Sequence, residues 1–143
     1  MPTRSPNRSV QRKLLRLLIV DDSAAVRNSL TNLCNLVPLV KVIGEAADGL
    51  KAMDAVRKLK PDVVTLDIAM PRMNGLEVLR ALRSEQLQCK VIVLSGCLEE
   101  PYRVQCRELG ADYVFDKGTE IVKAMQLLRT LAVDCNQNQN QNK

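Results

Sequence analysis

Residues 17–27 read LLIVDDSAAVR, and the rest of the chain is interpreted outward from this stretch. An apolar run ends in two adjacent aspartates, Asp21 and Asp22, and a helical pattern begins one residue later. Such a run is typical of a strand that is covered on both faces of a parallel sheet. Two adjacent carboxylates repel each other, so their position at the end of a buried strand calls for a neutralising partner.

The same order of strand and helix recurs along the chain. Further strand candidates are VKVIGEA (40–46), KPDVVTLD (60–67), KVIVLSG (90–96) and GADYVFD (110–116), each followed by a helical pattern that is weakest at 101–109. Five such units without a hairpin signal predict a single α/β domain. We expect a doubly wound, five-stranded parallel sheet of the flavodoxin-like order 2-1-3-4-5, with helices on both faces.

The composition changes at both ends of the chain. Residues 1–13 contain four basic residues and no acid, so the net charge of +5 belongs mainly to this segment. We expect residues 1–13 to form a basic flexible tail, 14–133 the folded domain and 134–143 a disordered Asn/Gln-rich tail. The basic tail is interpreted as a solubilising extension, and a weak contact with nucleic acid or an acidic partner is the alternative. Direct nucleic acid binding by the domain is not expected.

The composition also excludes several classes of protein. No apolar run approaches the roughly 20 residues that span a bilayer, and the N-terminus lacks the apolar core of a signal peptide. A cytoplasmic protein without membrane contact is therefore expected. The chain has five cysteines without a CxxC pair and no histidine, which excludes His-containing zinc sites and His-dependent nucleophilic catalysis.

Polar residues stand where four of the expected strands end. Asp21 and Asp22 follow the first strand, Asp67 the third, Ser95 the fourth and Lys117 the fifth. The carboxyl ends of parallel strands meet at one edge of the sheet, where open α/β folds form their sites. Oxygen ligands without histidine favour Mg²⁺. The paired aspartates are therefore predicted to hold a divalent metal, which would also stabilise charge on a transferred phosphoryl group.

Each of these residues also has an ordinary structural interpretation. Asp22 or Ser23 would cap the first helix, Asp67 would be a turn acid, and Lys117 would be a surface lysine. The functional interpretation is preferred because independent accidents would otherwise have to fall on one edge of the sheet.

Four stretches resemble the response-regulator receiver domain of two-component signalling. They are LLIVDDS, PDVVTLDIAMPRMNGLEVLRALR, VIVLSG and GADYVFDKG, and the match covers roughly residues 14–133. DIAMPRMNG is the most specific of these motifs. The resemblance implies a CheY-like fold and a phosphoprotein that acts in a phosphorelay.

The resemblance also assigns roles to single residues. Asp67 would be the phosphoacceptor, which attacks a phosphohistidine. Asp22, Asp67 and the backbone carbonyl of Ala69 would bind Mg²⁺, and Asp21 would help through water. Ser95 and Lys117 would contact the phosphoryl group. The chain would be a switch that assists its own phosphorylation and dephosphorylation, and not an enzyme that turns over a substrate.

The partners implied are a sensor histidine kinase or histidine phosphotransferase and an unidentified downstream protein. A phosphorylation-dependent dimer also fits the family. We expect a stand-alone receiver that signals through altered protein binding. The alternatives are a receiver cut from a longer DNA-binding regulator and a pseudo-receiver that binds partners without phosphorylation. A haloacid-dehalogenase-type phosphatase is disfavoured, because DDSAA stands where that family carries DxDx[TV].

Among the departures from the family pattern, two concern the fifth strand and the loop after it. Val114 stands where the family usually has an aromatic switch residue, with Tyr113 one residue earlier. Gly118 follows the lysine where proline is common, which predicts a looser loop before the last helix.

Overall fold

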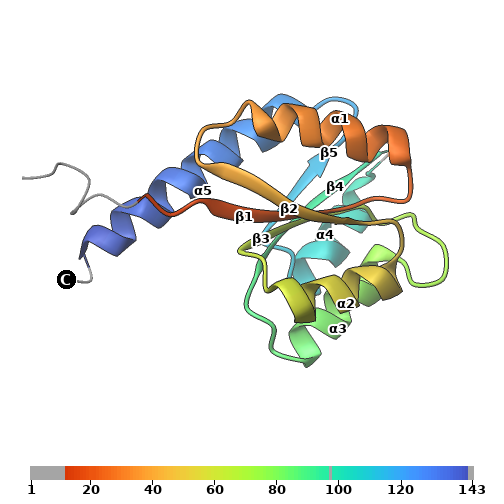
Figure 1. Ribbon diagram of the computed structural model, residues 1–143. Coiled ribbons are helices and arrows are strands. Elements are labelled where there is room, and N and C mark those ends of the chain that lie inside the picture. Colours follow the sequence, from red (N-terminus) through yellow and green to blue (C-terminus); the bar gives the residue numbers. More distant parts are fainter. Residues whose placement is uncertain (1–11, 97, 142–143) are drawn as a thin grey trace, which may run out of the picture.

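The computed structural model describes residues 12–96 and 98–141, in which strands and helices alternate along the chain (Figure 1). The elements are β1 (Leu15–Val20), α1 (Ala24–Asn35), β2 (Val40–Ala46), α2 (Gly49–Leu59), β3 (Val63–Leu66), α3 (Gly75–Ser84), β4 (Lys90–Ser95), α4 (Glu100–Glu108), β5 (Tyr113–Asp116) and α5 (Ile121–Gln141).

The strands form one parallel sheet in the order β2-β1-β3-β4-β5. This confirms the predicted doubly wound α/β fold. All strands run in the same direction, so the sheet has an amino edge, where the strands begin, and a carboxyl edge, where they end. The chain order reverses between β1 and β3, which places the switch point of the fold beside the ends of these two strands.

Alternating side chains of the sheet build a hydrophobic core on each face. On β1, Leu18 and Val20 pack with α2, α3 and α4, whereas Leu17 and Ile19 pack with α1 and α5. Figure 1 shows the same division, with α1 and α5 on one side of the sheet and the other three helices on the opposite side. Burial on both faces explains why the strands are nearly continuous apolar runs.

The last helix is longer than the sequence analysis expected. Residues 134–141 continue α5, whereas the sequence analysis expected residues 134–143 to be disordered. The helix can continue because residues 134–141 contain no proline or glycine that would stop it. Asn136 accepts a hydrogen bond from the Lys13 backbone N–H and donates one to the Lys13 carbonyl, both at 3.0 Å. Residues 1–11 of the expected basic tail lie outside the described residues. Neither α5 nor any other described helix has the length and apolar character needed to cross a membrane.

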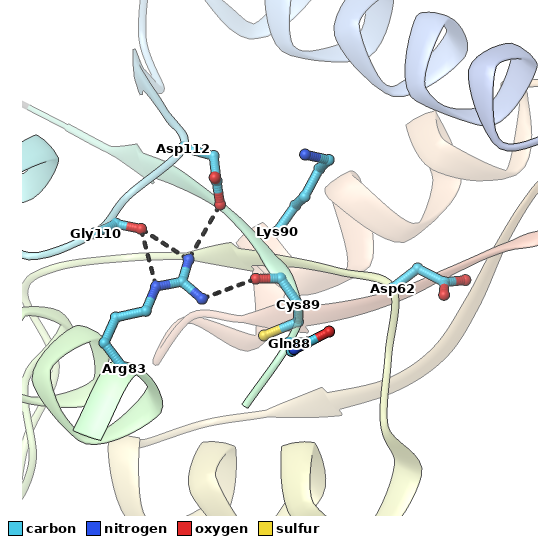
Figure 2. Close-up of a pocket in the computed structure, with 7 residues that line it drawn as sticks. All are labelled: Asp62, Arg83, Gln88, Cys89, Lys90, Gly110 and Asp112. Atoms are coloured by element: carbon cyan, nitrogen blue, oxygen red, sulfur yellow. Dashed lines mark hydrogen bonds and ion pairs between the residues drawn. The ribbon is translucent and has the colours of Figure 1, made fainter. Parts of the chain in front are cut away.

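Arg83 of α3 ties together the loops of the amino edge (Figure 2). Its guanidinium donates two hydrogen bonds to the Gly110 carbonyl, at 2.7 and 3.1 Å, and one to the carboxylate of Asp112 at 3.1 Å. It also donates to the carbonyls of Leu87 and Cys89. Gly110 has a φ of 105°, and a Cβ there would lie 2.7 Å from the Arg83 Cγ, so this close approach requires glycine. The shallow cavity of about 400 Å³ beside Arg83 is therefore framed by a rigid network.

Candidate functional site

The carboxyl edge brings together the polar residues that the sequence placed at the strand ends. One oxygen from each carboxylate of Asp21, Asp22 and Asp67 lies within 4.8 Å of the other two. Asp21 and Asp67 are buried, at 2% and 6% exposed, whereas Asp22 is exposed. The three acids thus form a cluster that opens to solvent on the Asp22 side.

The first helix is capped by Ser23, which leaves Asp22 without that structural role. The Ser23 hydroxyl accepts a hydrogen bond from the Val26 N–H at 3.2 Å, as an N-cap residue does. Within the described part of the chain, the Asp22 carboxylate makes no hydrogen bond or ion pair. Capping therefore does not explain why an aspartate stands at position 22.

Asp21 is fixed by contacts with its own domain. Its Oδ1 accepts a hydrogen bond from the Ser23 N–H at 2.9 Å, and its Oδ2 contacts the Lys117 Nζ at 2.5 Å. The Arg27 guanidinium donates to the Asp21 carbonyl at 2.7 Å and to Glu45 at 3.0 Å. The sequence analysis did not identify Arg27, because a single arginine in a helical pattern carries no signal of its partner on another element.

Asp67 is the carboxylate on which the other groups converge. The Ser95 Oγ donates a hydrogen bond to its Oδ1 at 2.8 Å, and the Lys117 Nζ lies 3.6 Å from its Oδ2. Burial raises the pKa of Asp67; the hydrogen bond from Ser95 and the charge of Lys117 oppose this shift. Neither a simple turn acid nor a surface lysine describes these two residues, because Lys117 is only 22% exposed and ion-paired.

The loop after Asp67 packs against its backbone. A Cβ at Gly75 would lie 2.3 Å from the Asp67 carbonyl oxygen, so only glycine allows α3 to begin this close to Asp67. Asn74 caps α3 and forms a reciprocal capping box with Glu77. The motif PRMNG therefore fixes the start of α3 beside the acidic cluster.

The loop that carries Lys117 is closed by Asp116. Its carboxylate accepts hydrogen bonds from the Gly118 N–H at 2.8 Å and the Thr119 N–H at 3.2 Å. A proline in place of Gly118 could not donate the first of these bonds. The glycine that was expected to loosen this loop thus supplies a bond that closes it.

The fifth strand has no aromatic side chain on the face that α4 covers. Val114 is buried there, at 7% exposed, whereas Tyr113 and Phe115 pack on the opposite face with α5. An aromatic rotamer at position 114 is therefore not a means by which this site communicates with α4.

The donor set fits Mg²⁺. Carboxylate oxygens are the hard ligands that this ion prefers, and one or two carboxylates with several waters are its usual protein environment. Asp22 and Asp67 are the residues that would hold it: Asp22 has no partner among the described residues, and Lys117 lies farther from Asp67, at 3.6 Å, than from Asp21, at 2.5 Å. Ala69 is exposed in the loop after β3, and the role of its carbonyl stays a prediction.

Comparison with known proteins identifies a family over most of the folded chain. The response regulator receiver domain matches residues 17–129. A protein-glutamate methylesterase/protein-glutamine glutaminase of Treponema denticola is 36% identical over 122 residues, which are 82% of this chain and 33% of that protein. The response regulator GacA of Pseudomonas aeruginosa is 34% identical over 116 residues, which are 81% of this chain and 54% of that protein.

Solved structures give the same result. The response regulator domain of Thermotoga maritima CheB has a TM-score of 0.76 and 31% identity, covering 87% of this chain and 98% of that chain. A chain of the CheX–CheY–BeF3–Mg²⁺ complex from Borrelia burgdorferi also has a similar structure, with a TM-score of 0.74 and 30% identity, covering 83% of this chain and 88% of that chain. The chain spans between about a quarter and a half of the length of the curated relatives that it matches.

Proposed function

The chain belongs to the response regulator receiver domain family, and we propose that it is a switch that accepts a phosphoryl group on Asp67. The observation that carries this proposal is the convergence of Ser95, Lys117 and two further aspartates on one buried carboxylate. A structural acid of the same fold needs only partners that neutralise it. Asp67 instead lies beside the Ser95 hydroxyl, the Lys117 ammonium and two further carboxylates, of which Asp22 is exposed to solvent.

In the proposed reaction, a carboxylate oxygen of Asp67 attacks the phosphorus of a phosphohistidine. The P–O bond forms as the P–N bond breaks, and the imidazole leaves and takes up a proton. Ser95 and Lys117 are placed to contact the oxygens of the transferred group, where they would offset its charge. Lys117 lies nearer to Asp21 than to Asp67, at 2.5 and 3.6 Å, so it would move from one to the other.

Mg²⁺ bound by Asp22 and Asp67 would supply the charge neutralisation that phosphoryl transfer between anionic groups requires. The presence of Mg²⁺ and BeF3 in the Borrelia burgdorferi complex supports this assignment. Asp21 would act on the site through its ion pair with Lys117 and through water.

A hollow beside the site supports a helical phosphodonor. It has a volume of about 280 Å³, lies between α1 and α5, and is lined mostly by apolar side chains such as Val26, Leu30 and Ile121. Lys117 also lines it, so a helix of a histidine kinase or phosphotransferase seated there would face Asp67.

The output of the switch would be protein binding through α4, β5 and α5. Among the described residues of α4 only Cys106 is buried, and Tyr102 and Val104 expose about half of their surface. An element with so few buried anchors is repositioned at low cost. Such an output needs no catalysis by the domain itself, and it fits a cytoplasmic protein. Phosphorylation-dependent dimerisation through this surface is a further outcome that the family offers.

We further infer that residues 14–133 form the receiver proper and that the protein acts as a stand-alone receiver. The second candidate is the receiver domain of a longer regulator. It is favoured by the lengths of the relatives, because the chain covers only 33% of the methylesterase and 54% of GacA. The apparent mass of the natural protein in a cell extract, detected with an antibody against this domain, separates the two.

The phosphoacceptor proposal is tested by intact mass after incubation with acetyl phosphate, with and without Mg²⁺. A single Mg²⁺-dependent phosphoryl adduct is expected, and it should be absent in Asp67→Asn. Asp62→Asn is the matched control, because Asp62 lies at the amino edge and bonds the Arg16 N–H. This control should be labelled like the unaltered protein.

Two results would contradict the proposal. An adduct that persists in Asp67→Asn would place the phosphoryl group on another residue. Absence of both an adduct and a stable beryllofluoride complex, despite Mg²⁺ binding, would indicate a pseudo-receiver that binds its partners without phosphorylation.

A further inference from the structure

One carboxylate, that of Glu120, connects the lysine loop to a helix of the output surface. Its Oε1 accepts a hydrogen bond from the Asp116 N–H at 2.9 Å, and the Glu120 N–H donates to the Asp116 carbonyl at 2.8 Å. These two bonds close a loop of five residues, 116–120, with Lys117 inside it. The backbone that carries Lys117 therefore cannot shift without Glu120.

The same Glu120 oxygen is bonded to α4. The Arg103 Nη2 donates to it at 2.7 Å, and the two side chains are only 19% and 20% exposed. The hydrogen bond from the Asp116 N–H and then the hydrogen bond from Arg103 lower the pKa of Glu120 to about 2, so the pair is ionised at neutral pH. Shielding from water makes such a pair a firmer connection than the usual surface ion pair.

The two ends of α4 are held very differently. Glu99 caps the helix without a side-chain hydrogen bond, so the Arg103–Glu120 pair is the main polar tie of its first half. Beyond its last turn, Gly110 is fixed by two hydrogen bonds from Arg83. The first half of α4 can therefore move while the segment after its last turn stays in place.

We propose that Glu120 is a positioning residue that joins Lys117 to α4, so that a movement of Lys117 is transmitted to the first half of that helix. This rests on the proposed function, in which Lys117 leaves Asp21 for the phosphoryl oxygens. The loop between Asp116 and Glu120 moves with Lys117, and Arg103 follows the Glu120 carboxylate. A receiver with valine at position 114 thereby communicates with α4 through an ion pair.

The test uses the whole chain, with beryllofluoride and Mg²⁺ as the stable mimic of the phosphoryl group. Arg103→Gln removes the positive charge of Arg103 and leaves the hydrogen bond between the Glu120 carboxylate and the Asp116 N–H intact. Amide hydrogen exchange is measured with and without the mimic. The response of residues 100–108 should fall about threefold to tenfold in Arg103→Gln, the range of typical coupling energies, while residues 113–120 respond as before.

Two further variants serve as controls. Arg107→Gln removes a charge from the same helix, but among the described residues Arg107 is paired only with the exposed Glu100, at 3.9 Å. This variant should keep the full response. Arg103→Lys keeps the cation and should restore most of the response. A loss that is merely structural would not be rescued in this way.

A full response of α4 in Arg103→Gln would overturn the proposal, and so would equal losses in the Arg103 and Arg107 variants. Failure of the unaltered protein to bind beryllofluoride would instead overturn the proposed function on which this inference rests. The two failures are distinguishable, because binding is measured in the unaltered protein first.

Discussion

The two edges of the sheet use the same kinds of side chain for different purposes. At the amino edge, Asp112 accepts hydrogen bonds from the Val91 N–H and from Arg83. The Arg83 guanidinium donates to Asp112 and to the carbonyls of Gly110, Cys89 and Leu87, and Figure 2 shows the first three of these contacts. At the carboxyl edge, Asp22 has no partner among the described residues, and burial raises the pKa of Asp67. Acids and bases meet at both edges, but among the described residues the Arg83–Asp112 group pairs its charges, whereas the cluster at the carboxyl edge leaves the Asp22 carboxylate without a partner.

This difference shows how a functional cluster is separated from a structural one. Three carboxylates whose oxygens lie within 4.8 Å of one another repel each other unless a cation neutralises them. The network around Arg83 is complete, so it needs no ligand and binds loops to one another. The cluster around Asp67 is incomplete, so a cation and a phosphoryl group would complete it.

The strongest way to break the comparison is to remove Arg83. Arg83→Met should lower the free energy of unfolding by about 2 to 4 kcal/mol, because the carbonyls of Gly110 and Cys89 lose their partners. Labelling of Asp67 by acetyl phosphate should be unchanged. Urea unfolding measures the first quantity and intact mass the second.

Arg80→Met is the matched control for this prediction. Arg80 is exposed on the same helix and its replacement should change stability by less than about 0.5 kcal/mol. A loss of labelling in Arg83→Met that exceeds its loss of folded protein would show that the two edges are not independent.

Mg²⁺ should stabilise the folded protein through the carboxyl edge alone. At ten times the dissociation constant the expected gain is about 1.4 kcal/mol, seen as a rise in the thermal midpoint. Asp22→Ala should abolish this gain at little cost to basal stability, because its carboxylate has no partner to lose. Asp112→Ala should show the reverse, with lower basal stability by about 1 to 3 kcal/mol and an undiminished Mg²⁺ effect.

Removing the charge of Asp67 should stabilise the protein in metal-free buffer at neutral pH. Burial raises the pKa of Asp67 above its usual 3.8, so the folded state binds this proton more readily than the unfolded chain. Ionisation of Asp67 therefore costs stability as the pH rises through the raised pKa. Asp67→Asn should therefore have a higher free energy of unfolding than the unaltered protein at pH 7.5, with a smaller difference toward pH 4.

Urea unfolding of both proteins across this pH range measures the gain. A gain that does not depend on pH would mean that ionisation of Asp67 is not its source. Addition of Mg²⁺ should reverse the order of stability, because the unaltered protein alone keeps both of the carboxylates proposed to bind the ion.

The smallest expected change in stability comes from the two hydrogen bonds between Asn136 and Lys13, which join the two ends of the domain. Asn136→Ala removes both hydrogen bonds to Lys13 and should cost about 0.5 kcal/mol, because alanine recovers part of the loss through its helix propensity. Faster amide exchange at Lys13 is the sharper measurement. Gln137→Ala, on the exposed side of the same turn, should leave that exchange unchanged.

Much of this molecule could be predicted from the chain alone, for reasons that are visible in single residues. Strands covered on both faces are long apolar runs, so β1, β3 and β4 were found with the correct topology. Asp21, Asp67 and Lys117 meet because parallel strands end at one edge. Periodicity is a short-range signal that survives in the folded state.

The remaining features depend on three-dimensional contacts. Periodicity cannot show that Arg27 reaches the Asp21 carbonyl or that Arg103 reaches Glu120, because both bonds join separate elements of the fold. The low complexity of residues 134–141 suggested disorder, yet α5 continues there and Asn136 contacts a residue 123 positions earlier in the chain. Such a contact leaves no local pattern in the sequence.

The bond between Lys13 and Asn136 also has a consequence for how the domain can be joined to other proteins. It places the first and last parts of the folded unit together at the amino edge, on the side of the sheet away from Asp67. A reporter or tether attached at either end would therefore leave the domain there and keep the phosphorylation surface accessible. The domain could likewise be inserted into a loop of a host protein, since neighbouring ends permit such grafts. Its switch would then face away from the host.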